Sequence, residues 1–164
     1  MLGQAFYTDD VIESALRHIG TMDPDVIGEG HFYVAVTEDD GIVGSGGWSR
    51  RAPGYDGGHG RSAAADHRPQ DSVFIRGVYV SPDRTRQGIA TAIMARAEDE
   101  VFKAGVAEVS LMATLAGAPL YRALGYRLVK PKLLRFPDGI VFEAVDMMKR
   151  LSAIPDPLGR KVAA

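Results

Sequence analysis

The residues whose spacing most clearly suggests chemistry lie in residues 78–91, where an apolar run gives way to Gly88 and, two places later, Ala90. The run before this turn reads as a buried strand, and a helical pattern begins after Gly88. The first turn of a helix carries N–H groups with no internal partner, and the helix dipole adds partial positive charge there. The turn therefore predicts an anion site suited to a pyrophosphate, with Arg84 and Arg86 at its rim. An ordinary strand-to-helix turn with one glycine and surface arginines fits the same residues.

Apolar periodicity predicts the elements that would position this turn. Residues 8–19 read as an amphipathic helix, with Thr8, Asp9 or Asp10 capping its first N–H groups and Gly20 ending it, and a short helical turn is expected from Pro24. Strands are expected at residues 31–36 and 42–48, joined as a hairpin, and at 73–80, 107–113, 126–134 and 141–149; helices are expected at 87–103 and 119–124. This order predicts an α/β fold.

Glycines interrupt the second strand of the expected hairpin, at Gly44, Gly46 and Gly47. A glycine inside a strand weakens it and suggests a bulge or a close backbone neighbour. Residues 50–72 show no periodicity, so we expect a long loop there, and we expect a frayed tail from residue 155.

Composition excludes several classes of protein. The chain has 164 residues, no cysteine and a formal net charge of −2 with scattered Lys and Arg, which excludes disulfides and argues against a nucleic-acid-binding surface. No apolar run is long enough to cross a membrane, and residues 1–10 lack the pattern of an export signal. We expect a cytoplasmic protein without nucleic-acid or membrane partners.

Residues 78–91 resemble the cofactor loop of the GNAT-superfamily N-acetyltransferases, whose pattern is Arg/Gln-x-x-Gly-x-Gly/Ala. Gly88 and Ala90 match its second half, whereas Thr85 stands at the first position. A second resemblance lies downstream, where residues 121–126 match the family's Tyr-x-x-Leu-Gly-Phe/Tyr motif. The hairpin ending at Trp48 takes the place of the family's second and third strands, so the resemblance covers residues 8–150.

The resemblance implies an α/β (α+β) fold with a GNAT-like mixed, largely antiparallel central sheet flanked by helices, as a single acetyltransferase domain over residues 1–164. Only residues 1–7 precede the first predicted helix. We therefore expect the chain to lack the family's first strand and helix. One flank of the sheet would then be exposed, and a second copy of the chain, as in a homodimer, could cover it.

The resemblance also implies acetyl-CoA as co-substrate and an amine of a small molecule or peptide as acceptor, with no metal. Tyr121 matches the tyrosine that protonates or hydrogen-bonds the departing thiolate, and Thr114 stands where many members have Asn. Backbone groups of residues 78–80 would hold the pantetheine, and N–H groups of residues 86–91 the pyrophosphate. The implied cofactor-binding residues are Val78, Tyr79, Val80, Arg86, Gln87, Gly88, Ile89, Ala90, Thr91 and Thr114.

Chemistry beyond the cofactor is less defined by the sequence. A strand N–H could polarise the thioester carbonyl. The general base is not identified, and a water chain could serve; the carboxylates near predicted strand ends are Glu29, Asp71, Glu108 and Glu143. In the 50–72 loop, His59 and His67 could act as base, touch substrate or, with Asp56 and Asp66, bind a metal, but their spacing matches no recognised metal site. Trp48 and Tyr55 could line the acceptor pocket, although a position in the core or at the end of the hairpin fits Trp48 at least as well.

Two other functions remain open from the sequence. The first is a non-catalytic acyl-CoA-binding sensor or subunit, which would need the same cofactor loop without turnover. The second is a nucleotide-binding regulatory domain, which the missing Lys-Ser/Thr of a P-loop disfavours.

Overall fold

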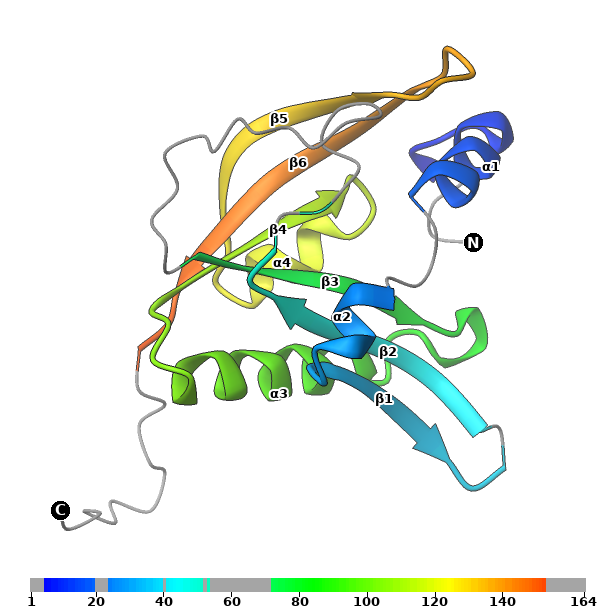
Figure 1. Cartoon of the computed structure of the whole chain (residues 1–164). Helices are drawn as coiled ribbons and strands as arrows, with labels where there is room; N and C mark the ends of the chain where they lie inside the picture. Colours follow the sequence, from blue (N-terminus) through cyan, green and yellow to red (C-terminus); the bar gives the residue numbers. More distant parts are fainter. Residues whose placement is uncertain (1–4, 20–23, 40, 52, 54–71, 153–164) are drawn as a thin grey trace, which may run out of the picture.

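The computed structural model describes residues 5–19, 24–39, 41–51, 53 and 72–152 (Figure 1). Every predicted helix and strand is present, with bounds within two residues of those expected. The elements are α1 (Asp9–His18), α2 (Pro24–Gly28), β1 (Phe32–Thr37), β2 (Gly41–Ser49), β3 (Ser72–Val80), the 3-10 turn η2 (Pro82–Arg84), α3 (Ile89–Lys103), β4 (Glu108–Thr114), α4 (Ala118–Ala123), β5 (Arg127–Arg135) and β6 (Val141–Arg150).

The strands form one sheet in the order β1-β2-β3-β4-β6-β5. All neighbouring strands are antiparallel except β3 and β4, which are parallel. The predicted mixed, largely antiparallel sheet flanked by helices is thus confirmed. Several residues considered from the sequence lie outside the described part of the chain: Gly20, Tyr55, Asp56, His59, Asp66, His67 and Asp71.

The parallel pair at the centre of the sheet separates soon after it forms. β3 and β4 pair only from Ser72 opposite Glu108 to Phe74 opposite Ser110. Beyond these residues the two strands diverge, as Figure 1 shows, so among the described strands the second half of β3 pairs with β2 alone. The described sheet therefore opens at its centre, between β3 and β4.

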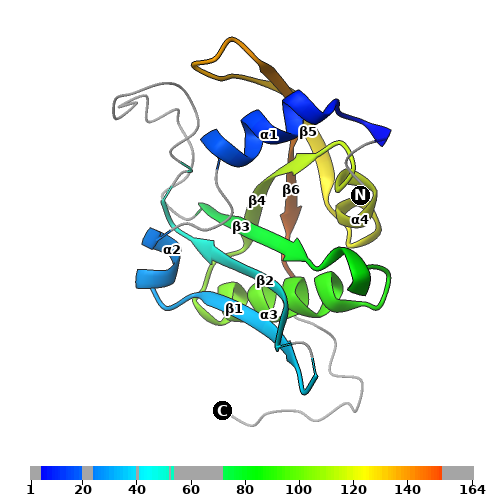
Figure 2. The ribbon, with the colours of Figure 1, turned by 90° about the vertical axis from the view of Figure 1, so that its right-hand side faces the viewer.

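Buried side chains form a separate cluster on each face of the sheet. Residues of β4 alternate between the two: Val109, Leu111 and Ala113 pack with α3 and α4, whereas Met112 packs with α1. Strand side chains alternate between faces, so these clusters lie on opposite sides. Figure 2 shows α3 and α1 on their respective sides. Helices thus support the central strands from both faces.

α1 is the first α-helix of the described chain, and no strand precedes it in residues 5–8. β1 forms one edge of the sheet, with Val34 and Val36 exposed.

Thr8 takes the N-cap position of α1, but its side chain forms no capping hydrogen bond, and Asp9 and Asp10 lie within the first turn. Exposed first-turn carboxylates still interact favourably with the helix dipole.

Candidate functional site

The turn from β3 to α3 has a tightly specified backbone. Ser81 N–H donates to Val43 O of β2 at 2.9 Å, and Arg84 N–H donates to Ser81 O at 2.9 Å. The chain then passes through two left-handed conformations, at Arg86 (φ 64°) and Gly88 (φ 82°). Gly adopts this region without strain, whereas Arg does so at a cost, and such strain concentrates at functional loops.

The N–H groups that follow this turn lie at the start of α3. The first hydrogen bond of α3 runs from Ala92 N–H to Gly88 O at 2.9 Å. Within the described part of the chain, no acceptor meets the N–H groups of residues 86–91, and no side chain caps Gly88. Residues 86–88 are exposed. We call residues 86–91 the amide cradle; free N–H groups at a helix N-terminus are the arrangement that binds phosphate.

Glycines of β2 allow the amide cradle to lie close to the sheet. A Cβ at Gly44 would lie 2.7 Å from Ile89 Cγ2, and a Cβ at Gly46 would lie 2.7 Å from Ile93 Cγ2. Contacts this short would force a shift of α3 or of β2, so these two positions need glycine. The glycines predicted a bulge or a close backbone neighbour, and both are present: the pairing of β2 with β3 shifts between Ser45 and Gly47, and a Cβ at Gly47 would clash with His31 O.

The bulge lies in the part of β3 that has left β4. Ser45 pairs with Tyr79 and Gly47 with Arg76, so an extra residue of β3 sits opposite Gly46, and Gly77 takes a φ of 62°. Ser81 N–H points to β2. Since backbone groups alternate along a strand, the N–H groups of Val80 and Val78 point the other way, toward the diverging β4. Of the three predicted pantetheine contacts, Val78 and Val80 therefore face the side where β4 diverges, whereas Tyr79 pairs with Ser45 of β2.

Tyr121 lies in the core on the α3 side of the sheet. Its side chain is 9% exposed and makes an edge contact with Tyr126, with ring centroids 5.9 Å apart. Burial raises the pKa of Tyr121 to about 12, and the nearby Tyr79 hydroxyl adds to the shift. The Tyr121 hydroxyl is therefore protonated at neutral pH, so it has a proton to donate, but it is a weaker acid than a free tyrosine.

Thr114 and Tyr121 come together around Gly117. The Thr114 Oγ1 accepts a hydrogen bond from Gly117 N–H at 3.0 Å. A Cβ at Gly117 would lie 3.1 Å from Thr114 Oγ1 and 3.3 Å from Tyr121 Cε2. The Thr114 hydroxyl keeps its own hydrogen to donate. Thus the two residues predicted from the downstream motif share one turn, at the end of β4.

Other residues considered from the sequence lie elsewhere. Trp48 is buried in the core and stacks on His31 with ring centroids 3.9 Å apart, so the core position is correct and the pocket position is not supported. Glu29 lies 3.4 Å from Arg51 and Glu143 is exposed. Among the described residues no group of three or more His, Cys, Asp or Glu could hold a metal ion, and no helix is long and apolar enough to span a membrane.

One side chain near this site carried no sequence signal. Tyr7 donates a hydrogen bond to Glu143 O and accepts one from Leu115 N–H, both at 2.7 Å. Its partners are more than 100 residues away, so no local pattern could have indicated them.

Comparison with known proteins agrees with this geometry. The model of the Acetyltransferase (GNAT) family matches residues 5–126. No curated protein sequence matches the chain. Among solved structures, the fold is similar to ribosomal-protein-alanine N-acetyltransferase from Brucella melitensis (TM-score 0.58, 18% identity, covering 78% of this chain and 74% of that one). It is also similar to PaiA N-acetyltransferase from Thermoplasma acidophilum in complex with coenzyme A (TM-score 0.59, 16% identity, covering 92% of this chain and 84% of that one). A third similar structure is an acetyltransferase of the GNAT family from Staphylococcus aureus (TM-score 0.55, 14% identity, covering 89% of this chain and 96% of that one).

At 14–18% identity, these acetyltransferase structures show that the chain shares their fold. Since the family model covers well over half of the sequence, the chain belongs to the GNAT acetyltransferase family.

Proposed function

We propose that this protein transfers the acetyl group of acetyl-CoA directly to the nitrogen of an amine. The observation that carries the proposal is the amide cradle, where the N–H groups of residues 86–91 have no protein partner in the described chain. These groups suit a pyrophosphate, because they lie on one turn at the positive end of α3. Arg86 adds a positive side chain at the same turn.

Val78, Val80 and Thr114 would then have roles that are consistent with their positions. Val78 and Val80 would bond the pantetheine amides along the unpaired edge of β3, and the Thr114 hydroxyl would reach the same arm from β4. The N–H groups of β3 near the Gly77 bulge would bond the thioester carbonyl oxygen, where negative charge develops. Bound acetyl-CoA supplies an activated acyl group and a thiolate leaving group.

Proton transfers complete the reaction. As the amine nitrogen bonds the carbonyl carbon and the C–S bond breaks, the Tyr121 hydroxyl would donate a proton to the leaving sulfur and be reprotonated from solvent. The amine must lose one proton, and water could accept it. A cytoplasmic location and a homodimer stay predictions.

The test is acetyl-CoA turnover by the full chain against a library of small amines and peptides with free N-termini, read as released thiol. The protein has no cysteine, so a thiol reagent gives no background from the enzyme. We expect thiol release with at least one amine. We also expect CoA at 100 times its Kd to stabilise the fold by about 2.7 kcal/mol, a rise of roughly 5–10 °C in Tm.

Three other outcomes would argue against the proposal. Stabilisation by CoA without thiol release from any amine would favour a non-catalytic acyl-CoA-binding protein. Stabilisation by ADP equal to that by CoA would favour a nucleotide-binding regulatory domain. No stabilisation by CoA and no thiol would contradict both CoA-based functions.

A further inference from the structure

The antiparallel pairing of β4 with β6 identifies a backbone hydrogen bond, between Leu115 and Glu143, that a side chain replaces. At one end of the pairing, Leu151 N–H donates to Ala107 O at 2.9 Å, which marks a hydrogen-bonded pair. The register continues to Thr114 opposite Ala144. Hydrogen-bonded pairs recur at every second residue of an antiparallel ladder. The next such pair after Ala113 would be Leu115 with Glu143.

Tyr7 occupies this position with its hydroxyl group. Leu115 N–H donates to Tyr7 Oη at 2.7 Å, and Tyr7 Oη donates to Glu143 O at 2.7 Å. The hydroxyl therefore stands between the N–H and C=O groups that would otherwise bond each other. Burial raises the pKa of Tyr7, so the hydroxyl keeps the proton that it donates.

The Tyr7 ring is held in place for this role. It stacks on Phe142 of β6 with ring centroids 5.0 Å apart and an interplanar angle of 17°. Figure 2 shows the N-terminal segment beside the end of β4. The ring contact and the two hydrogen bonds come from different parts of the side chain, so the hydroxyl can be removed while the ring stays.

The end of β4 depends on this support because β3 does not provide any. β4 pairs with β3 only as far as Ser110, so its last residues are paired on the β6 side alone. Leu115 directly follows Thr114, and the turn at Gly117 leads into α4 with Tyr121. A change in the spacing of Leu115 and Glu143 would therefore move both predicted site residues.

We propose that Tyr7 is a positioning residue of the acyl-transfer site: its hydroxyl replaces the last hydrogen bond of the β4–β6 ladder and holds Thr114 and the start of α4 at the spacing that CoA requires. This inference rests on the proposed function, because it assigns Tyr7 a role in the proposed acyl-transfer site. The insertion of the hydroxyl itself can be tested without turnover.

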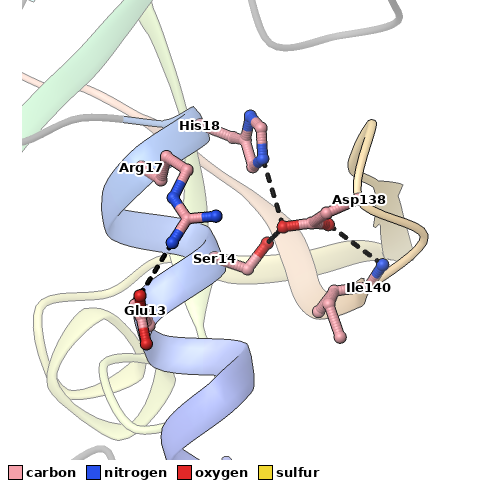
Figure 3. A network of polar contacts seen from close by, with 6 residues as sticks. All are labelled: Glu13, Ser14, Arg17, His18, Asp138 and Ile140. Carbon is pink, nitrogen blue, oxygen red and sulfur yellow. Dashed lines mark hydrogen bonds and ion pairs between the residues drawn. The ribbon is translucent and has the colours of Figure 1, made fainter.

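The test compares Tyr7→Phe with the control Ser14→Ala. Ser14 is buried and donates to Asp138 at 2.7 Å, so its loss weakens the attachment of α1 to the turn between β5 and β6 and leaves both hydrogen bonds of Tyr7 in place (Figure 3). Each variant should lose roughly 2–6 °C in Tm. We expect Tyr7→Phe to raise the KM for acetyl-CoA and the calorimetric Kd for CoA about fivefold or more, and to lower kcat. Ser14→Ala should stay within about twofold of wild type in all three.

Equal effects of the two variants, or unchanged kinetics and CoA affinity in Tyr7→Phe, would overturn the proposal. If the wild type binds CoA without turnover, the enzymatic function fails while the Kd comparison still tests Tyr7. If Tyr7→Phe does not fold, or CoA does not bind, amide hydrogen exchange in the wild type provides the test. Protection of Leu115 N–H similar to that of Leu151 N–H, at the other end of the same ladder, supports the inserted hydroxyl, and rapid exchange at Leu115 overturns it.

Discussion

Tyr121 is the residue that links the buried core to the proposed chemistry. Its ring belongs to the core cluster under α3, and the raised pKa shows how strongly this surrounding disfavours the charged form. A thiolate leaves tolerably without help, so proton donation by Tyr121 should assist the reaction and not be indispensable to it.

We therefore expect Tyr121→Phe to lower kcat by about 10–100-fold while the Kd for CoA is unchanged, because the ring stays and only the hydroxyl is lost. Steady-state kinetics and calorimetry would measure the two quantities. A rise in Kd with normal kcat would assign the hydroxyl to cofactor binding instead.

The same variant tests the pKa of Tyr121. The pKa in the folded state is raised to about 12 from 10.0. Because burial disfavours the charged form, the contribution of this group to stability is complete below pH 10 and is lost as the pH rises from 10 toward 12. In wild type the free energy of unfolding should fall over this range with a slope of up to about 1.4 kcal/mol per pH unit from this group. Denaturant titrations should show a smaller fall in Tyr121→Phe; an identical fall in both proteins would contradict the assignment.

At the scale of elements, the position of α3 depends on β2. The helix brings its N-terminus to the sheet over Gly44 and Gly46, where no side chain separates strand from helix. Short apolar contacts of this kind tolerate added volume poorly, because a packed interface has no space to receive it. The amide cradle is thus placed by a neighbouring strand as well as by its own sequence.

We expect Gly46→Ala to destabilise the fold by about 1–3 kcal/mol and to weaken CoA binding, because the new methyl group would push α3 away from β2. Its Cβ would lie 2.7 Å from Ile93 Cγ2 and 3.1 Å from Val78 Cγ2. Gly28→Ala is the matched control, since a Cβ there meets nothing within 4 Å and Gly28 does not have a positive φ. Thermal denaturation and calorimetry with CoA would compare them, and equal CoA affinity in the two variants would contradict the role of Gly46.

At the scale of the whole molecule, hydrogen bonds join α1, near the start of the described chain, to the β5–β6 hairpin, near its end. α1 packs on the β5–β6 hairpin, and Asp138 in the turn of that hairpin accepts hydrogen bonds from Ser14 Oγ at 2.7 Å and from Ile140 N–H at 3.1 Å (Figure 3). His18 Nε2 lies 3.2 Å from the same carboxylate, and its ring stacks on Phe136. Ser14 above all, and then the Ile140 N–H and His18, hold the pKa of Asp138 below its usual range.

This shift predicts a dependence of stability on acid pH. A lowered pKa in the folded state means that the carboxylate stabilises the fold above its unfolded pKa of about 3.9, and that this contribution is lost as the pH falls through the lower folded value. Asp138→Asn should therefore lower the Tm at pH 6, and the difference from wild type should shrink below about pH 4. A difference in Tm that does not change with pH would show that the charge of Asp138 contributes nothing.

Local patterns in the sequence determined the elements and the resemblance of the cofactor loop. Apolar periodicity, Gly and Pro positions and short motifs all act within a few residues, and the helices and strands were therefore predicted to within two residues. The glycines of β2 likewise indicated a bulge or a close backbone neighbour.

Only the tertiary structure decided how these elements meet. The early separation of β3 from β4, the core position of Trp48 and the insertion of the Tyr7 hydroxyl between Leu115 and Glu143 each depend on residues far apart in the chain. Such contacts arise from packing and hydrogen bonding across the sheet, which leave no periodic signal in the sequence. The amide cradle depends on both kinds of information. Gly88 is visible in the local sequence, whereas the separation of β3 from β4 beside the cradle is decided by the tertiary structure.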